Sequence, residues 1–150
     1  DVYFTSLTVG PENIDTSLGY FQLAEAFATV GRTDDALAMY DKVAELWYKC
    51  MRALATAPAS PEPSLSEAKL AAGLEMLGAV VRRREQHLGK SHMACAEARF
   101  VLGLVQLRAG ARGDARASLS VAHELYGVCL GTSHASTREV QEALAMLESM

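Results

Sequence analysis

Glutamates, histidines and cysteines are the side chains of this sequence that could carry acid–base, nucleophilic or metal chemistry. Two of the four histidines, His87 and His92, flank a helix break and do not form the i, i+4 pair of a helical metal site. The glutamates lie singly in helical patterns, and none has a local partner for general acid–base catalysis. The sequence has neither a glycine-rich phosphate loop nor a Gly-x-Ser-x-Gly nucleophile elbow. We therefore predict a chain that is not an enzyme, with no catalytic, cofactor-binding or metal-binding residue and no bound cofactor.

The cysteines Cys50, Cys95 and Cys129 are odd in number and contain no Cys-x-x-Cys pair. Each falls in a helical pattern, where a free cysteine behaves as a small buried hydrophobic residue. Reduced cysteines are typical of proteins kept in a reducing compartment. We therefore expect an intracellular protein with a cytoplasmic location.

Two short clusters are candidates for contact with a partner protein. Arg82, Arg83 and Arg84 form the only dense basic run, and three successive helix positions wrap around roughly 200° of a helix. One interpretation is a solvated helix end, where arginine is favourable near the C-terminus, and the other is contact with an acidic protein surface. Trp47 continues an apolar stripe and is expected in the core, whereas Tyr48 points elsewhere and could anchor a partner. The candidate partner contacts are Tyr48, Arg82, Arg83 and Arg84.

The composition describes a chain that can bury a core and that has no bias toward polyanions. Half of the residues are hydrophobic, 21% are charged, and the formal net charge is −4. A mildly negative chain favours neither nucleic acid nor an anionic membrane. No apolar run approaches the roughly 20 residues that span a bilayer. We expect protein partners, with no nucleic acid and no membrane.

The elements that must position these side chains are helical by their apolar spacing. Helical patterns cover residues 13–30, 33–57, 64–88, 91–109, 113–130 and 132–150, and residues 1–7 resemble the tail of a further, truncated helix. The apolar run 101–105 could be a buried strand on composition alone, but its flanks are helical and we assign it to a helix. The expected fold class is all-α, with about six to seven helices.

Helix ends and faces follow from the same patterns. The expected N-caps are hydroxyl or carboxylate residues: Asp15, Thr16 or Ser17 for the first full helix, Ser91 for the fourth, and Thr132 or Ser133 for the last. Residues 58–63 contain three prolines and form an irregular, extended linker. The helix after that linker is expected to bury the stripe Leu70, Leu74, Leu77, Val81 and Leu88.

Residue identities recur at a fixed offset of 79 residues, which is typical of a repeated helical unit. A scaffold of stacked helix pairs needs similar residues at equivalent positions of its units, because each unit buries its apolar face against a similar unit. The offset pairs are Gly10/Gly89, Phe21/Phe100, Leu23/Leu102, Gly31/Gly110, Asp35/Asp114, Ala36/Ala115, Ala38/Ala117, Glu45/Glu124, Leu46/Leu125 and Cys50/Cys129.

A second spacing leaves the middle of the chain irregular. The segment Leu-Gly-x-x-His occurs at residues 88–92 and again at 130–134, which gives a unit of about 42 residues. Only one clear helix lies between Cys50 and Gly89, where a pair is expected. The long second helix could bend near Cys50 and serve twice, the middle unit could have lost a helix, or residues near 57–63 could be absent. The first and third explanations are favoured, because a deleted helix would break the superhelix.

Residues 17–50 resemble a tetratricopeptide repeat, and residues 99–129 resemble one less closely. In the first pair Tyr20, Leu23, Ala24 and Phe27 match the family's first helix, and Ala36, Tyr40 and Val43 match its second. In the later pair Leu102, Gly103, Ala115, Leu119 and Ala122 match, but Arg99 and Gln106 stand where aromatic residues are usual. The connectors look like those of the longer, kinesin-light-chain type of repeat. His92 and His134 are expected to cap the next helix or to bond to the turn, rather than to bind metal. The resemblance implies a helical solenoid with an irregular middle repeat.

The first third of the chain resembles the tetratricopeptide region of the zinc finger MYND domain-containing protein 12 family. The resemblance is carried by residues 3–7, 10–16, 19–21 and 40–47, and the chain looks like an algal-type relative of that family. That resemblance implies a scaffold of the ciliary or flagellar axoneme that docks or stabilises a single-headed inner-arm dynein. The implied partners are a dynein heavy chain, another tetratricopeptide protein of the axoneme and, as a further candidate, the doublet microtubule. The clustered Cys and His of a MYND finger are not in these residues.

Two alternatives stay open. A kinesin-light-chain-like cargo adaptor would need basic first helices, and those of this chain carry few basic residues. A MYND-type methyltransferase would keep its catalytic part outside these residues. We expect residues 1–150 to form a single repeat domain that is a fragment of a longer chain.

Overall fold

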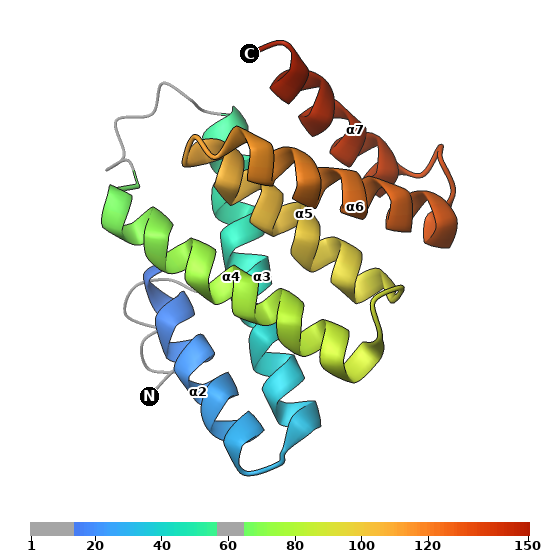
Figure 1. Cartoon of the computed structure of the whole chain (residues 1–150). Coiled ribbons are helices and arrows are strands. Elements are labelled where there is room, and N and C mark those ends of the chain that lie inside the picture. The colour runs from blue at the N-terminus through green and yellow to red at the C-terminus, as the bar shows by residue number, and fades with distance from the viewer. Residues whose placement is uncertain (1–13, 57–64) are drawn as a thin grey trace. The chain divides into compact units, whose positions relative to one another are not determined.

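The computed structural model describes residues 14–56 and 65–150, which form helices and connecting turns without a strand (Figure 1). The predicted all-α class and the predicted helices agree with these elements to within a few residues, and residues 101–105 are helical as expected. The expectations for residues 1–13 and for the linker 58–63 lie outside the described residues. In chain order the elements are η1 (Ile14–Thr16, a 3-10 helix), α2 (Ser17–Thr29), α3 (Thr33–Thr56), α4 (Glu67–Leu88), α5 (Met93–Arg108), α6 (Arg112–Leu130) and α7 (Ala135–Glu148).

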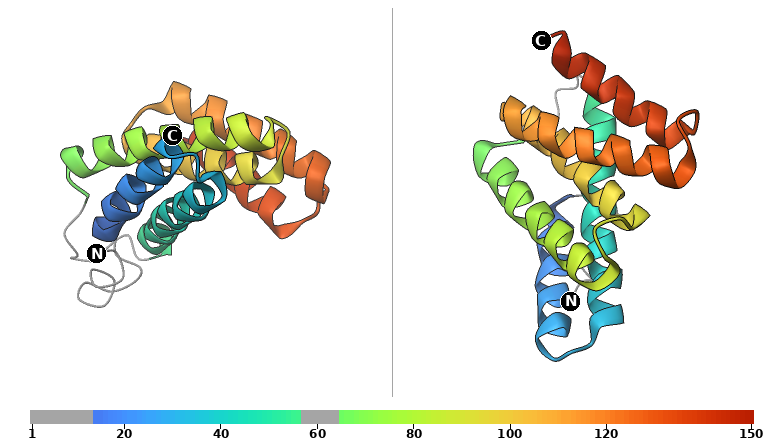
Figure 2. Two further views of the ribbon diagram at one scale, coloured as in Figure 1. Left: turned by 90° about the horizontal axis from the view of Figure 1, so that it is seen from below. Right: turned by 45° about the vertical axis from the view of Figure 1, so that its right-hand side comes forward.

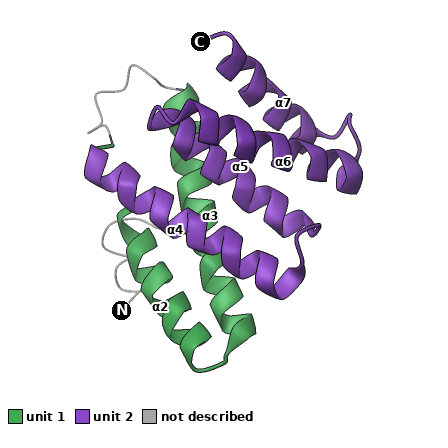
Figure 3. Ribbon diagram, viewed as in Figure 1, with its two compact units in different colours: residues 1–66 green, residues 67–150 purple. Residues whose placement is uncertain are grey.

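The chain divides into two compact units, residues 1–66 and residues 67–150 (Figure 3). In the first unit α2 packs against α3, and η1 contacts both helices. In the second unit α4 packs against α5, α5 against α6 and α6 against α7, and α5 also contacts α7 (Figure 2). Each unit therefore has helix–helix packing of its own.

The α2–α3 pair is held by a small residue, by aromatic rings and by buried polar bonds. Ala24 on α2 is fully buried, and the rings of Phe21 and Tyr40 lie 6.2 Å apart. The Trp47 indole nitrogen donates a hydrogen bond to the Ser17 hydroxyl oxygen (3.2 Å), and that hydroxyl donates to the Ile14 carbonyl (2.6 Å). The prediction that Trp47 lies in the core is confirmed.

The predicted side-chain cap of α2 is wrong. Thr16 stands at the N-cap position but makes no side-chain capping hydrogen bond. Ser17, the other hydroxyl candidate, is buried and is the first residue of the helix. Its hydroxyl closes the preceding 3-10 turn and accepts from Trp47, so tertiary packing has recruited a group that the sequence suggested for capping.

The α5–α6 pair crosses at a glycine. A Cβ atom built on Gly103 would lie 2.8 Å from both Cγ and Cδ2 of Leu119, so no side chain fits at this crossing without movement. Leu119 is fully buried between Ala115 and Ala122, which are also fully buried. Each of these four residues lies 79 residues after a buried residue of the α2–α3 pair. The equivalent residues are Ala24 for Gly103, Tyr40 for Leu119, Ala36 for Ala115 and Val43 for Ala122. The two pairs therefore use one packing arrangement, with small residues where the helices approach most closely.

The helix ends repeat as well. After α2 the Arg32 N–H bonds to the carbonyl five residues back, and after α5 the Ala111 N–H does the same, each at 2.9 Å. The Gly31 and Gly110 N–H groups bond three residues back, at 3.2 and 3.1 Å. This double bond pattern is the Schellman motif, and glycine at its centre confirms the predicted helix stops.

Helix α4 has the buried face of a second helix of a pair. Each of the five buried positions of α6 has a buried equivalent in α4 at an offset of 42 residues, and α4 also buries Ala79 and Val81. The matched pairs are Gly73/Ala115, Met76/Ser118, Leu77/Leu119, Val80/Ala122 and Arg84/Tyr126. The position held by Arg84 in α4 and Tyr126 in α6 is held in α3 by Trp47, which lies 79 residues before Tyr126 and is also buried.

This register corrects the predicted stripe of α4. Leu77 and Val81 are buried as expected, but Leu88 is 37% exposed, and Met76, Val80 and Arg84 are buried instead. Helix α3 runs unbroken as one element from Thr33 to Thr56, and no first helix of a pair lies between α3 and α4 in the described part of the chain. In the described residues α3 is therefore followed directly by α4, and the bend expected near Cys50 does not interrupt α3.

Candidate functional site

Two connectors, residues 88–92 between α4 and α5 and residues 130–134 between α6 and α7, have the same conformation. Gly89 and Gly131 adopt φ of +87° and +96°, a backbone region that glycine enters without a Cβ clash. His92 and His134 are the N-caps, and their Nδ1 atoms accept hydrogen bonds from the backbone N–H two residues later, each at 3.0 Å. The prediction that these histidines cap helices is confirmed. The predicted caps Ser91, Thr132 and Ser133 are wrong, because these residues lie within the turns.

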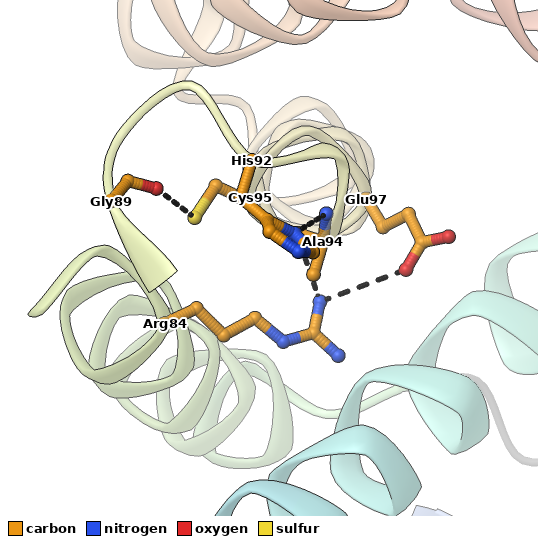
Figure 4. Close-up of polar contacts among 6 residues, drawn as sticks. All are labelled: Arg84, Gly89, His92, Ala94, Cys95 and Glu97. Carbon is orange, nitrogen blue, oxygen red and sulfur yellow. Dashed lines mark hydrogen bonds and ion pairs between the residues drawn. The ribbon is translucent and has the colours of Figure 1, made fainter. Parts of the chain in front are cut away.

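A further bond ties each connector to the helix that follows it. The Cys95 thiol donates to the Gly89 carbonyl (3.2 Å; Figure 4). In the second connector the Thr137 hydroxyl donates to the Gly131 carbonyl (2.8 Å). Both side chains are fully buried. The sequence predicted that Cys95 lies in the core, which is confirmed, but it did not predict this bond. The signal that could have revealed it is a small polar side chain three residues after each capping histidine.

The surroundings of Cys95 make it a poor nucleophile. Burial raises the pKa of the Cys95 thiol above its ordinary value, and the carboxylate of Glu85 raises that pKa further. Arg84 and Arg99 act in the opposite direction and do not cancel these effects. A protonated thiol is neither a nucleophile nor a metal ligand, so the group serves as a hydrogen-bond donor within the turn.

Arg84 does not belong to a solvated basic cluster. Its residue is 3% exposed, and Figure 4 shows its side chain turned toward the start of α5. Its Nη1 atom donates to the Ala94 carbonyl (2.5 Å) and lies 3.9 Å from a carboxylate oxygen of Glu97. The expectation that all three arginines wrap the helix surface is therefore wrong for Arg84. Its position is the one that Trp47 and Tyr126 fill with rings, so a long arginine stem packs where an aromatic side chain packs elsewhere.

The other three candidate contacts are at or near the surface. Arg82 is exposed and Arg83 is half-buried on α4, in the second unit. Tyr48 is half-buried on α3, in the first unit, where the Arg52 guanidinium lies over its ring and donates to its hydroxyl (2.9 Å). Arg82 and Arg83 thus share one helix of the second unit, and Tyr48 lies on a helix of the first unit.

The two departures from the repeat pattern carry polar contacts between helices. Arg99 on α5 pairs with Glu85 on α4, with its Nη2 atom 3.0 Å from a carboxylate oxygen, and its buried Nε has no hydrogen-bond partner. Gln106 on α5 accepts a hydrogen bond from the buried Ser118 hydroxyl on α6 (2.7 Å). Polar pairs therefore replace the rings expected at these two positions.

Metal-binding clusters and membrane-spanning helices do not occur in the residues that the structure describes. No group of three or more His, Cys, Asp or Glu side chains among residues 14–56 and 65–150 could hold a metal ion. Within the same ranges, none of the helices combines the length and the apolar character needed to cross a membrane. No protein-family model matches the chain.

Proposed function

We propose that this chain is a tetratricopeptide-type scaffold of the ciliary or flagellar axoneme that docks or stabilises a single-headed inner-arm dynein without catalysing a reaction. The proposed partners are the dynein heavy chain, a second tetratricopeptide protein and, as a further candidate, the doublet microtubule. The axonemal setting rests on the resemblance to zinc finger MYND domain-containing protein 12, carried by residues 3–47. Part of that resemblance, residues 3–13, lies outside the described residues.

The observation that supports a scaffold is the reuse of one helix-pair packing. Ala24 and Gly103 stand at equivalent crossings, and each of the five buried positions of α6 has a buried equivalent in α4. Repeated units of this kind present extended surfaces on which partners bind as helices or as extended segments. A catalytic site would instead require convergent reactive groups, and the most buried one, Cys95, is held as a hydrogen-bond donor.

The test is affinity capture from isolated axonemes, with the tagged chain as bait and quantitative mass spectrometry as the readout. We expect an inner-arm dynein heavy chain and a second tetratricopeptide protein to be enriched together. A bait carrying Tyr48→Ala tests the first unit's candidate anchor, and one carrying Lys42→Ala, an exposed residue of the same helix, is its matched control. Recovery of neither expected partner by the unmodified bait would reject the axonemal role.

A further inference from the structure

The exposed face of α6 keeps two residues of the corresponding face of α3 and changes the other two. The alanine and the glutamate are the same in both helices, whereas both lysines of α3 are valines in α6. All of these positions are exposed. At an offset of 79 residues the equivalent pairs are Ala38/Ala117, Lys42/Val121, Glu45/Glu124 and Lys49/Val128.

The four residues of α6, namely Ala117, Val121, Glu124 and Val128, lie on one side of that helix and form a surface that we call the α6 stripe. Their successive separations are four, three and four residues. At about 100° per residue, this spacing places the four side chains within about 60° of one another around the helix axis. The same geometry places Leu119, which is fully buried against α5, on the opposite side of the helix. The α6 stripe is therefore a continuous strip that faces away from the core.

The glutamate at the centre of this strip is paired in α3 and not in α6. One carboxylate oxygen of Glu45 lies 3.9 Å from the Lys42 Nζ and 4.0 Å from the Lys49 Nζ. In α6 both cations are replaced by valine, and no ion pair of Glu124 occurs in the described part of the chain. The α6 stripe thus presents a carboxylate between two apolar side chains.

Folding of the second unit does not explain the two valines. Val121 is 39% exposed and Val128 is 81% exposed, so neither side chain is taken up by the core. At an exposed helix position valine is less favourable than lysine, and the change also forfeits the helix-stabilising pairs with the glutamate. Both changes therefore disfavour the isolated helix, and contact with another protein would offset that cost.

We propose that the α6 stripe binds an amphipathic helix of a partner protein whose apolar residues flank one lysine or arginine. The partner's cation would pair with Glu124, in the way that Lys42 and Lys49 pair with Glu45 within α3. The partner's apolar residues would cover the two valines, and removal of water around the carboxylate would strengthen the ion pair. The proposal rests on the proposed function in one respect, namely that the chain binds proteins.

A second copy of this chain fits the α6 stripe less well than a basic partner helix. The valines lie three residues before and four residues after Glu124, so the stripe is nearly symmetric about that residue. An antiparallel pairing of Val121 with Val128 of a second copy would therefore bring two Glu124 carboxylates together. Like charges that meet across an interface disfavour association.

The repeat itself supplies the test variant. Val121→Lys combined with Val128→Lys installs the residues of α3 at exposed positions, so the fold should tolerate both changes. The probe is a fluorescein-labelled helical peptide with leucines along one face and a single lysine among them, and its binding to the full chain is followed by fluorescence anisotropy. We expect the double variant to bind this peptide roughly tenfold more weakly than the unmodified chain does. A peptide with glutamate in place of its lysine should bind the unmodified chain more weakly by a similar factor.

The matched control is Met146→Lys combined with Met150→Lys, which replaces two exposed apolar residues of the second unit and changes the charge by the same amount. Unchanged affinity in this control supports a local surface, whereas equal losses in both double variants would overturn the proposal. Absence of peptide binding, or equal affinity for the lysine and glutamate peptides, would also overturn it. Self-association of the unmodified chain that Val121→Lys and Val128→Lys abolish, measured by sedimentation equilibrium, would show instead that a second copy covers the stripe.

Failure of this proposal and failure of the scaffold role give different results. If axonemal capture enriches the expected partners equally with the unmodified chain and with the Val121→Lys, Val128→Lys variant, the α6 stripe is rejected and the scaffold role stands. If capture fails for both baits while peptide binding depends on the stripe, the axonemal role is rejected and the α6 stripe stands.

Discussion

Arg84 shows that a charged residue can fill a structural position that rings fill elsewhere in the same chain. Its guanidinium bonds to the Ala94 carbonyl, and its buried stem occupies the place taken by Trp47 in α3 and Tyr126 in α6. Arg82, only two residues earlier, is exposed. The run of three arginines therefore combines a core residue with a surface residue, and the two should differ sharply on substitution.

We predict that Arg84→Ala lowers the free energy of unfolding by about 1–3 kcal/mol, because it removes buried packing and leaves the part-buried Ala94 carbonyl with one bond fewer. Arg84→Tyr should cost less, since tyrosine occupies the equivalent position of α6. Urea denaturation followed by circular dichroism measures both. The control Arg82→Ala should stay within about 0.5 kcal/mol of the unmodified chain. Equal losses for Arg82→Ala and Arg84→Ala would contradict the assigned burial.

Cys95 is the second residue whose role depends on its equivalent in the repeat. Thr137 makes the same bond to the same carbonyl of the other connector. We predict that Cys95→Thr keeps this bond and folds with near-native stability at neutral pH. Cys95→Val, which has no donor, should be less stable than Cys95→Thr by about 1 kcal/mol. Thermal unfolding of the two variants side by side measures the difference.

The raised pKa of Cys95 also predicts a loss of stability in alkali. Below about pH 8.5 the thiol is protonated in both the folded and the unfolded chain, so its contribution is intact. Above that pH the unfolded chain releases the proton while the folded chain still holds it, so stability falls as pH rises toward the folded pKa. The unmodified chain should therefore lose more stability than Cys95→Thr between about pH 8 and pH 10. Parallel pH profiles for the two proteins would show that Cys95 is not the titrating group.

At the scale of elements, the α5–α6 crossing sets how closely two helices can approach. A methyl group on Gly103 would overlap Leu119, at 2.8 Å from its Cγ and Cδ2 atoms. Alanine is favoured over glycine in a helix by about 1 kcal/mol, but overpacking a core costs about 1–3 kcal/mol. The clash should outweigh the helix propensity, because Cγ is near the stem of Leu119 and cannot swing away freely.

We therefore predict that Gly103→Ala lowers the free energy of unfolding by roughly 1 kcal/mol net. The matched control is Gly113→Ala on α6, where a Cβ atom would meet nothing within 4 Å. That control should leave stability unchanged or raise it slightly. Chemical denaturation of the two variants gives the comparison, and a stabilised Gly103→Ala variant would show that α5 and α6 do not cross closely at this residue.

At the scale of the whole molecule, the two units should respond separately to local damage. Trp47 is the only tryptophan of the chain and lies in the first unit, so its fluorescence reports that unit alone. Circular dichroism reports the helices of both units. Arrays of repeated units lose cooperativity when one part is weakened more than its neighbours.

We predict that Gly103→Ala, in the second unit, shifts part of the circular dichroism transition to lower denaturant while the Trp47 fluorescence midpoint stays in place. The reciprocal variant, Val43→Ala in the first unit, should move the Trp47 midpoint and remove a buried side chain at a cost of about 1–3 kcal/mol. Coincident shifts of both signals in both variants would show that the chain unfolds as one cooperative body.

The sequence by itself determined the helices, their approximate limits, their glycine stops and the recurring identities, because these depend on local order. Apolar spacing placed six helices to within a few residues, and the Leu-Gly-x-x-His segments identified His92 and His134 as caps. The offset of 79 residues identified two helix pairs that the structure packs alike. A helix, its glycine stop and its cap all involve residues within a few positions of one another, so one sequence contains their signal.

Only the tertiary structure decided which face of each helix is buried and which polar groups meet across helices. Helix α4 offers two overlapping stripes at helical spacing, and packing chose the one that contains Arg84 and leaves Leu88 at the surface. The bonds of Arg84 to Ala94 and of Cys95 to Gly89 depend on how the chain folds back at the connector. Periodicity gives the width of a buried face, but its direction around the helix is set by neighbouring helices, whose positions follow from packing of the whole unit.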